Sequence, residues 1–358
     1  MINGSKNKGD WSEFYALLYL IGERQLYSAD KNLNRMPGFY FPIQKVIRNE
    51  DHEKMIEYVL SGKQSVEIYV GGDLVKSMTS DEFRKEARML FHDLTKASGA
   101  QFTIPHAETF LNKIELDRLG ASSAEVTDIK LDLHDVHTGI NQVMGFSIKS
   151  YVGGAPTLLN ASEATNFVFK INRIDDDTMN YVNAIETRSK IVDRIAYIKN
   201  VSCDWPFMGV TSKVFASNLQ MIDSSMERIL ADLLKCSYFS NELSCRELID
   251  KISKRNPLHY YRHDIYEYKF KKFLAAKALG MNPGQKWDGL DEANGGYIVV
   301  KDDGDVLAYH LYNRNELEQY LFDNTRLERA STSKHNYAKI YKQGDNYYIN
   351  LNLQIRFK

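Results

Sequence analysis

The chain has 358 residues, of which 43% are hydrophobic and 26% are charged, and its formal net charge is −1. These values predict a soluble globular protein of one large or two medium domains, and the absence of any apolar run of about 18 residues excludes a membrane-spanning helix. The near-neutral charge gives no overall signal for nucleic-acid binding, and three cysteines without a Cys-x-x-Cys spacing argue against a disulfide scaffold or a cysteine zinc site.

The N-terminal part is predicted to open with a helix. Asp10 is a suitable N-cap, and the apolar residues from Phe14 to Ile21 follow it at helical spacing. The residues before this helix are polar and lack the apolar stretch of a signal peptide, so we expect a cytoplasmic protein. A short apolar run predicts a strand at 66–70, and two further helices are expected at 80–97 and 105–119.

Residues 128–152 carry the clearest pattern in the chain. Polar and apolar residues alternate strictly in DIKLDLH (128–134), which is the pattern of a half-buried strand. A segment rich in turn residues follows, and then a second strand, FSIKSYV (146–152). The two strands are predicted to form a hairpin with a tight turn near Thr138-Gly139.

The remainder of the chain is predicted to contain both helices and strands. Helices are expected at 161–172 and 211–236, and the pattern changes to strands past Trp287. The main domain boundary is placed near residues 200–210. The C-terminal elements are expected as strands at 296–300, 306–312 and 347–357, with a helix near 314–323.

The predicted hairpin can hold a metal ion for phosphodiester hydrolysis. Period two puts Asp128 on the polar face of the first strand, and it puts Ser147 and Lys149 together on one face of the second. Hydrolysis of a phosphodiester needs a hard cation on oxygen ligands, a positioned water and positive charge against the developing phosphorane. Asp128 can hold Mg²⁺, and Lys149 can orient or deprotonate the water. The same pattern also fits a solvent-facing strand with cross-strand ion pairs.

The arrangement of Asp128, Ser147 and Lys149 resembles the motif of the PD-(D/E)xK nuclease superfamily. In that motif an Asp lies on one strand, and the next strand carries an acid, or a residue that replaces it, followed two residues later by a Lys. Over nearly its whole length the chain is similar to the HpaII restriction endonuclease family. The residues that carry this resemblance are KGDWSE (8–13), DIKLDLHD (128–135), GFSIKS (145–150), LLNASEATNF (158–167), GMNPGQKWDGLDEANGGYIVV (280–300), STSKH (331–335) and LNLQIRF (351–357).

The resemblance implies a type II restriction endonuclease that requires Mg²⁺, cuts double-stranded DNA at CCGG sites and is blocked by methylation of the site. It implies an α/β fold, with a PD-(D/E)xK-like core in which helices flank a mixed central sheet, plus a β-rich C-terminal part. We therefore expect a nuclease catalytic domain over 1–205 and a helical and β-rich DNA-recognition region over 206–358. No nucleotide cofactor is expected, and both a monomer and a homodimer are compatible with this interpretation.

One departure from the superfamily motif concerns the metal ligands. The superfamily Asp corresponds to Asp128 and its lysine to Lys149, but the acid expected two residues before the lysine is Ser147. A hydroxyl is a neutral and weaker Mg²⁺ ligand than a carboxylate, so a second carboxylate must come from elsewhere, or only one metal ion binds tightly. Asp132 shares the strand face of Asp128 and becomes the main ligand if the turn is displaced by two residues. Asp128 is preferred, because superfamily acids tend to lie at this end of the strand.

Glu13 is a further catalytic candidate. Related nucleases often supply a glutamate from the first helix, and KGDWSE resembles that element. The spacing of Asp10 and Glu13 is also close to a capping box, in which Glu13 bonds the N-cap amide. Both interpretations stay open at this point.

Three groups of residues are predicted to contact DNA. Asn160, Ser162 and Asn166 follow the catalytic strand and can either bond phosphates or cap the expected helix. The stretch 251–277 carries eight Lys or Arg against two acids, which favours phosphate contact through Lys271 and Lys272, with a solvated helix face as the alternative. The third group is expected to read G·C base pairs and consists of Arg326, Arg329, Ser331 and Lys334.

Two other classes of function are consistent with the sequence. The replacement of an acid by Ser147 suits a protein that binds DNA without cutting it, on a degraded nuclease fold. In the second class, the hairpin acids only decorate the surface of a structural or partner-binding protein.

Overall fold

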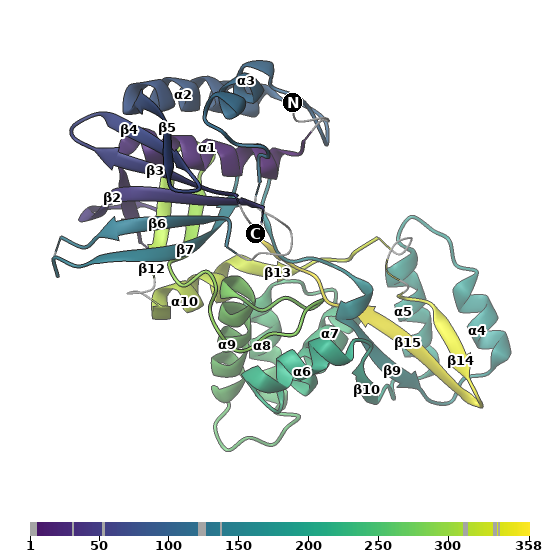
Figure 1. Cartoon of the computed structure of the whole chain (residues 1–358). Helices are drawn as coiled ribbons and strands as arrows, with labels where there is room; N and C mark the ends of the chain where they lie inside the picture. Colours follow the sequence, from purple (N-terminus) through teal and green to yellow (C-terminus); the bar gives the residue numbers. More distant parts are fainter. Residues whose placement is uncertain are drawn as a thin grey trace. The chain divides into compact units, whose positions relative to one another are not determined.

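The computed structural model describes residues 6–30, 32–51, 54–120, 127–136, 138–310, 314–331, 335 and 337–358 (Figure 1). The chain forms two compact units. Unit 1 consists of Met1–Pro156, Ala278–Gly280 and Asp291–Leu317, and unit 2 consists of Thr157–Lys277, Met281–Leu290 and Glu318–Lys358. Each unit is therefore built from segments that are distant in the sequence.

These units differ in extent from the predicted domains, 1–205 and 206–358. Residues 157–205 fold with unit 2, and residues 291–317 fold with unit 1. The assignment of catalysis to one part of the chain and DNA recognition to the other remains a prediction.

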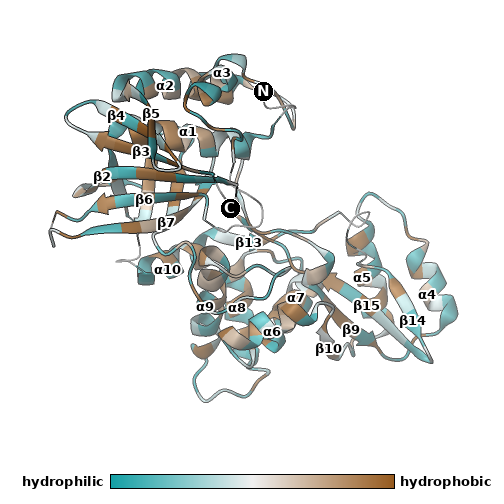
Figure 2. Cartoon of the chain, in the orientation of Figure 1, coloured by the Kyte–Doolittle hydropathy of each residue, from teal (hydrophilic) through white to brown (hydrophobic). Residues whose placement is uncertain are grey.

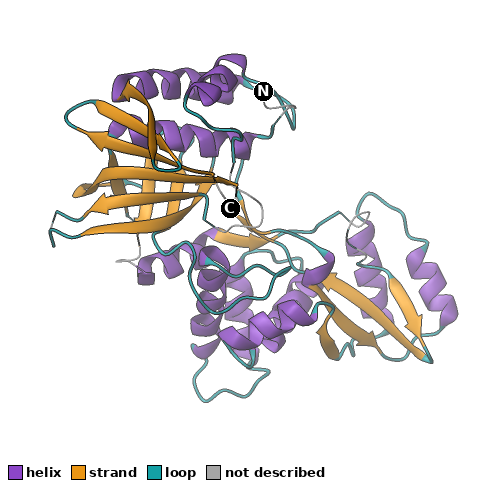
Figure 3. Cartoon of the chain, viewed as in Figure 1, coloured by secondary structure: helices purple, strands orange, loops and turns teal. Residues whose placement is uncertain are grey.

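Unit 1 is built round a mixed sheet (Figures 1 and 3). Nine strands of the described residues form it, in the order β1-β12-β11-β7-β6-β2-β3-β4-β5. β7 pairs parallel with β11 and β1 pairs parallel with β12, whereas β6 and β7 are antiparallel. The mixed α/β architecture that was predicted is thus confirmed. The strands are β1 (Gln25–Ala29), β2 (Arg35–Asp51), β3 (Lys54–Ser61), β4 (Ser65–Val70), β5 (Asp73–Thr79), β6 (Ile129–His134), β7 (Asn141–Ser150), β11 (Gly296–Val300) and β12 (Val306–His310).

Helix α1 (Lys8–Glu23) forms the centre of the core of unit 1. It packs against α2 (Ser80–Lys96) and against β2 and β7, and α2 in turn contacts α3 (Pro105–Lys113). Figure 2 shows that α1 is apolar along most of its length, and Trp11, Phe14 and Leu18 are completely buried. A helix with apolar residues on nearly all sides is stable only when it is enclosed, which the sheet and α2 achieve here.

The N-terminus of α1 differs from the prediction. Asn7 is the N-cap in place of Asp10: its side chain accepts a hydrogen bond from the Asp10 N–H at 3.0 Å, and the Asp10 carboxylate accepts one from the Asn7 N–H at 3.4 Å. This reciprocal capping box satisfies two amide groups at the start of the helix. The alternative in which Glu13 caps the helix is therefore wrong.

Unit 2 combines helices with two smaller sheets. Its described strands form a four-stranded sheet, β10-β9-β15-β14, and a three-stranded sheet, β13-β16-β8. The strands are β8 (Thr157–Leu159), β9 (Asn166–Ile171), β10 (Phe207–Val210), β13 (Thr325–Leu327), β14 (Ile340–Gln343), β15 (Asn346–Asn352) and β16 (Ile355–Phe357). The other helices among the described residues are α4 (Asp176–Asn183), α5 (Lys190–Val201), α6 (Lys213–Ile222), α7 (Met226–Ser240), α8 (Cys245–Arg255), α9 (Ile265–Leu279) and α10 (Arg314–Asn324), of which α9 and α10 have residues in both units.

The helix predicted at 161–172 is wrong. This segment contains one 3₁₀ turn, η1 (Glu163–Thr165), and the strand β9. Ser162 and Thr165 do form a capping arrangement, but it ends after that single turn. β9 then pairs with β10 on one side and β15 on the other, so sheet hydrogen bonds replace the helical ones. Tertiary pairing here outweighs a local helix signal.

Other predicted elements are confirmed with changed ends. The strand at 66–70 is β4, the helix at 80–97 is α2, and the strands at 296–300 and 306–312 are β11 and β12. The helix expected at 105–119 ends at Lys113, and the helix expected at 211–236 is divided into α6 and α7 at Asp223, whose side chain accepts from the Ser225 N–H at 2.8 Å. The predicted β-rich C-terminal part is divided between the units, because β11 and β12 join the sheet of unit 1. Among the described helices, none has the length and apolar character needed to cross a bilayer.

Candidate active site

The predicted hairpin is present as β6 and β7. Ile129 pairs with Phe146 and His134 pairs with Asn141, so the connection between the two strands lies between His134 and Asn141. Alternate residues of β6 are buried, which leaves Lys130, Asp132 and His134 on the partly exposed face. The predicted alternation and the predicted turn position near Gly139 are therefore confirmed.

Asp128, Ser147 and Lys149 form one hydrogen-bonded network at the start of β6. The Asp128 N–H donates to the Phe146 carbonyl oxygen at 2.9 Å, which fixes Asp128 against β7. Its Oδ2 accepts from the Ile148 N–H at 2.5 Å and from the Ser147 Oγ at 3.1 Å. The Ser147 Oγ in turn accepts from the Lys149 Nζ at 2.9 Å. The structure thus brings together the carboxylate and the lysine that the sequence motif paired.

Ser147 links the two charged groups through a neutral hydroxyl. Its side chain is 3% exposed, so it lies inside the sheet face and not at the surface. A carboxylate at this position would sit next to that of Asp128 in a buried place, where two negative charges disfavour each other. The hydroxyl instead donates to the carboxylate and accepts from the ammonium.

Tyr297 completes the network from a third strand and was not identified from the sequence. In the parallel pairing of β7 with β11, Tyr297 is level with Ser147. The Lys149 Nζ lies 5.4 Å from the centre of the Tyr297 ring, within the range of a cation–π contact. Burial, with a smaller contribution from the Asp128 charge, raises the pKa of Tyr297 well above its ordinary value. Tyr297 therefore stays neutral and presents its ring to Lys149.

The segment before β11 packs tightly on Gly145, two residues before Ser147. The Gly145 N–H donates to the Asn294 Oδ1 at 2.7 Å, and the Gly145 carbonyl accepts from the Gly295 N–H at 2.7 Å. A Cβ at Gly145 would lie 2.8 Å from both the Glu292 carbonyl oxygen and a methyl group of Thr127. Only glycine fits here, and this close packing holds β7 in place beside Asp128.

Asp132 does not join this network. It pairs with Val143 across the hairpin, four residues along β6 from Asp128. At about 3.3 Å per residue, the two aspartates are about 13 Å apart along the strand. The observed register places Asp128, and not Asp132, opposite the Ser147–Lys149 stretch. A role for Asp132 as a metal ligand remains a prediction, and this register does not support it.

Glu13 lies beside Gly120. A Cβ at Gly120 would be 2.8 Å from the Glu13 Oε2, and a Cβ at Gly153 would be 2.5 Å from the Lys8 side chain. The first turns of α1 therefore lie close to Gly120 and to Gly153, which belongs to the loop after β7. Because the capping box uses Asp10 and not Glu13, the Glu13 carboxylate has no capping role. Its catalytic role remains a prediction.

The donor set around Asp128 suits a hard cation that keeps most of its water. Within the described ranges, no three His, Cys, Asp or Glu side chains are grouped so that they could hold a metal ion. Mg²⁺ is usually bound through one or two carboxylates, with waters at its other positions. One carboxylate beside a hydroxyl, on two adjacent central strands of the sheet, therefore fits Mg²⁺ and does not fit an all-protein cage of the calcium or zinc type.

The lysines predicted to contact phosphates are engaged within unit 2. The Lys271 ammonium bonds the Gln319 side chain at 2.6 Å and also pairs with Glu267. The Lys272 ammonium lies 2.9 Å from the Glu318 carboxylate. Their contact with DNA remains a prediction. To bind a phosphate, each lysine would have to leave its present partner or contact the partner and the phosphate together.

The polar residues after β7 have two kinds of surroundings. Asn160 is exposed and Ser162 is half-buried. Asn166 is only 2% exposed: its amide donates to the His335 carbonyl at 2.8 Å and accepts from the Asn352 amide at 2.8 Å. The Asn166 side chain thus stabilises unit 2, and DNA contact by these residues remains a prediction.

The predicted base-reading residues are only partly described. The Arg329 guanidinium stacks over the Tyr238 ring at 3.8 Å and donates to the Ser237 Oγ at 3.1 Å, and burial lowers the pKa of Arg329. Arg326 is half-buried in β13, and Ser331 is exposed. Lys334 lies outside the described residues. Base readout by these four residues remains a prediction.

Comparison with known proteins identifies relatives over the whole chain. The family model of the HpaII restriction endonuclease matches residues 7–357. The type II restriction enzyme HpaII of Haemophilus parainfluenzae is 39% identical over 357 residues, which cover 99% of this chain and 98% of that protein. No solved structure matches the chain.

Proposed function

Because the chain belongs to the HpaII restriction endonuclease family, and is thus a type II site-specific deoxyribonuclease, we propose that it hydrolyses double-stranded DNA at CCGG sites with Mg²⁺ as its cofactor. We further propose that methylation of the site blocks cleavage. The observation that carries the catalytic part of this proposal is the network of Asp128, Ser147 and Lys149 on two adjacent strands.

Asp128 is proposed to hold the cation through its Oδ1. Two hydrogen bonds to this carboxylate end on Oδ2, one from the backbone N–H of Ile148 and one from the Ser147 hydroxyl, and they fix the orientation of the carboxylate. When bound, Mg²⁺ supplies a water of lowered pKa and positive charge against the phosphorane. A carboxylate held in one orientation would bind the cation without a further loss of side-chain freedom.

Lys149 is proposed to act on the attacking water and to balance the negative charge that develops at phosphorus. Its ammonium group is held on one side by the Ser147 hydroxyl and lies over the Tyr297 ring. Neither contact neutralises the lysine, so its charge is available to the phosphate. We therefore assign Lys149 a catalytic role and Tyr297 a positioning role.

The PD-(D/E)xK-like core is part of the proposal. Its support is the antiparallel pair that carries Asp128 and Lys149, with a mixed sheet and an enclosed first helix beside it. Ser147 replaces the acid of the motif, so we propose that Glu13 supplies the second carboxylate. Its place on α1, which packs against β7, the strand of Ser147 and Lys149, supports this assignment.

DNA recognition is proposed for unit 2 and the residues that follow β7. Lys271 and Lys272 are assigned to phosphates, together with Asn160, Ser162 and Asn166. Base readout is assigned to Arg326, Arg329, Ser331 and Lys334, because arginine and lysine donate to the guanine O6 and N7 that every G·C pair presents in the major groove.

A plasmid-cleavage assay tests the function as a whole. A plasmid with CCGG sites should be cut into discrete fragments in Mg²⁺ and left intact in a chelator, and a plasmid methylated at CCGG should be left intact in both. The replacement of the motif acid by Ser147 favours one other function, a protein that binds DNA without cutting. Site-specific binding with no cleavage over a full Mg²⁺ titration would establish that alternative.

A further inference from the structure

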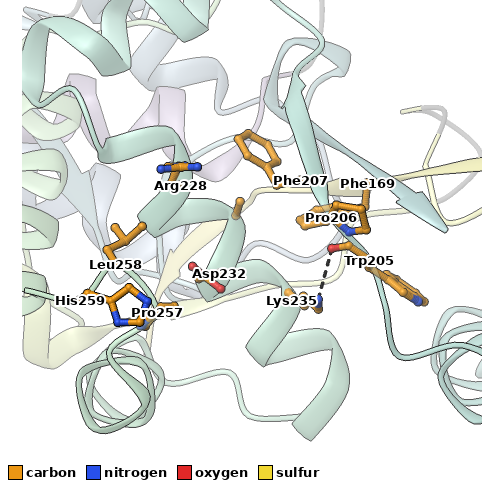
Figure 4. A pocket seen from close by; sticks show the side chains of 11 residues that line it. Phe169, Trp205, Pro206, Phe207, Arg228, Asp232, Lys235, Pro257, Leu258 and His259 are labelled. Atoms are coloured by element: carbon orange, nitrogen blue, oxygen red, sulfur yellow. Dashed lines mark hydrogen bonds between the residues drawn. The ribbon is translucent and has the colours of Figure 1, made fainter. Parts of the chain in front are cut away.

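Unit 2 contains a cavity that has no part in the site described above. Its volume is about 540 Å³, and it is lined by residues of β9, α7, the start of β10 and the segment before α9 (Figure 4). Cavities of roughly 300–1,000 Å³ commonly bind ligands with the size of a nucleotide. The residues assigned above to cleavage and to base readout do not line it, so the cavity requires an explanation of its own.

One wall of the cavity is aromatic and apolar. The Phe207 ring is half-buried and lies 5.8 Å from the rings of both Phe167 and Phe169, which hold it in place. Pro257 and Leu258 also line the cavity. A fixed aromatic face beside apolar groups favours a flat ring as ligand, because stacking gains contact area without ordering a flexible side chain.

The charged groups that line the cavity are one acid, Asp232, and two cations, Arg228 and Lys235, of which the Lys235 ammonium donates to the Trp205 carbonyl oxygen at 3.2 Å. Asp232 lines the cavity, and burial raises the pKa of its carboxyl group even though the Arg255 guanidinium lies 2.7 Å away. A partly buried carboxylate repels a phosphate and accepts hydrogen bonds from amino groups. The exposed Arg228, on the same helix, makes no hydrogen bond or ion pair with any residue that the structure describes. A base fits beside Asp232, and its own phosphate fits at Arg228.

We propose that this cavity binds one base of the DNA substrate, turned out of the double helix. The base stacks on Phe207, its amino or imino donors bond Asp232, and the adjoining phosphate contacts Arg228. The proposal rests on the proposed function, since CCGG contains only cytosine and guanine, and both carry donors that a carboxylate accepts: cytosine N4, and guanine N1 and N2.

Fluorescence of base analogues tests the proposal. Each cytosine or guanine of a CCGG duplex is replaced in turn by an analogue whose emission is quenched by its neighbouring bases in the duplex and not by a phenyl ring, and the full-length protein is added in a chelator so that no DNA is cut. The wild-type protein should raise the emission several-fold at one position of the site. Phe207→Leu should abolish this rise and weaken binding of the site about 5-fold to 150-fold, the range expected when a base–aromatic stack is removed. Asp232→Asn should lower the rise as well, because an amide offers the base one acceptor oxygen where the carboxylate offers two.

Two matched variants control for damage to the fold. Phe239→Leu removes another half-buried ring of unit 2, which packs on Trp205 at 4.9 Å and does not line the cavity. Arg255→Met removes the ion pair of Asp232 but keeps the carboxylate. Both variants should retain the emission rise. Loss of the rise in Phe239→Leu as well as in Phe207→Leu would assign Phe207 to the fold and overturn the proposal.

A mismatched duplex separates base capture from simple contact with the DNA surface. A base that is already unpaired costs less to turn out, so the wild-type protein should bind the mismatched duplex about tenfold more tightly than the matched one. Phe207→Leu should lose this preference. Equal weakening on both duplexes, without any emission rise, would make the cavity wall a surface contact and overturn the proposal.

Cleavage of unmodified plasmid distinguishes failure of this proposal from failure of the proposed function. If wild-type protein cuts CCGG and raises the emission at no position, the cavity does not bind a base, and the nuclease assignment stands. If the protein neither binds nor cuts CCGG DNA, both the proposed function and the inference that rests on it are wrong.

Discussion

The hairpin of unit 1 and the basic stretch of unit 2 hold their lysines in different ways. In the hairpin, the Lys149 ammonium contacts the Ser147 hydroxyl and the Tyr297 ring, which are neutral. In unit 2, the Lys272 ammonium lies 2.9 Å from the Glu318 carboxylate, and Lys271 pairs with a glutamate as well. A lysine held by neutral groups keeps its charge for a ligand, whereas an ion pair offsets it. Removal of a lysine should therefore have unlike consequences in the two regions.

Lys149→Ala should have the largest effect. We expect it to abolish cleavage and to leave binding of the CCGG duplex nearly unchanged, because the charge acts at the scissile phosphate and not on the bases. Rates of plasmid cleavage and binding isotherms in a chelator measure the two properties separately.

A second lysine of the same hairpin is the matched control for this variant. Lys130→Ala changes a residue on the partly exposed face of β6 that does not belong to the network, and it should cut at close to the wild-type rate. Cleavage by Lys149→Ala within about tenfold of wild type, a barrier change of at most ~1.4 kcal/mol, would remove Lys149 from the mechanism.

Gly145→Ala should have the next largest effect, because it disturbs the packing beside the network. The added methyl group meets a carbonyl oxygen and the Thr127 side chain at 2.8 Å. We expect a loss of about 1–3 kcal/mol in the free energy of unfolding together with slower cleavage. Gly284→Ala in unit 2 meets only an ordinary contact at 3.6 Å and should change stability by less than about 0.5 kcal/mol. Equal denaturation midpoints for the two variants would refute the packing argument.

Tyr297 tests whether a neutral ring positions the lysine. Tyr297→Leu should lower kcat/KM by about 2-fold to 30-fold, the range expected when a cation–π interaction of about 0.5–2 kcal/mol is removed. Tyr297→Phe keeps the ring and should restore most of the activity. If the Phe variant is as slow as the Leu variant, the hydroxyl and not the ring is the important group.

The paired lysines of unit 2 should give the smallest effect on cleavage. Replacing Lys271 and Lys272 with alanine should weaken binding of specific and non-specific duplexes alike. The slope of log K against log salt should become shallower by about one unit for each phosphate that the protein no longer neutralises. An unchanged slope would mean that both lysines form ion pairs within unit 2 and contact no phosphate. The lysines of the two regions would then differ in function as well as in their surroundings.

The catalytic hairpin could be predicted from the sequence because its determinants are local. Strict alternation in 128–134 specifies a half-buried strand, and the same period places Ser147 and Lys149 on one face of the next. The turn between them is short, so the register that brings Asp128 to Ser147 follows with little further information.

The parts that could not be predicted depend on contacts between distant segments. Tyr297 reaches the site only because β11 pairs in parallel with β7, and a run such as GYIVV does not reveal its neighbour. The segment 161–172 has a capping signal that produces a single turn, after which pairing with β10 and β15 makes a strand. The N-cap predicted at Asp10 is wrong for a local reason. Asn7, three residues earlier, is an equally suitable N-cap residue, and its side chain accepts the hydrogen bond from a backbone N–H of the first turn.

A Mg²⁺ titration of cleavage by two aspartate variants tests the central claim most directly. Asp128→Asn keeps the size of the side chain but removes the charge that is proposed to hold the cation, so cleavage should be lost or should require far more Mg²⁺. Asp132→Asn makes the same change about 13 Å along the same strand and should cut within about tenfold of the wild-type rate. The opposite result, loss of cleavage in Asp132→Asn with activity retained in Asp128→Asn, would contradict the assignment of the active site to Asp128 and Lys149.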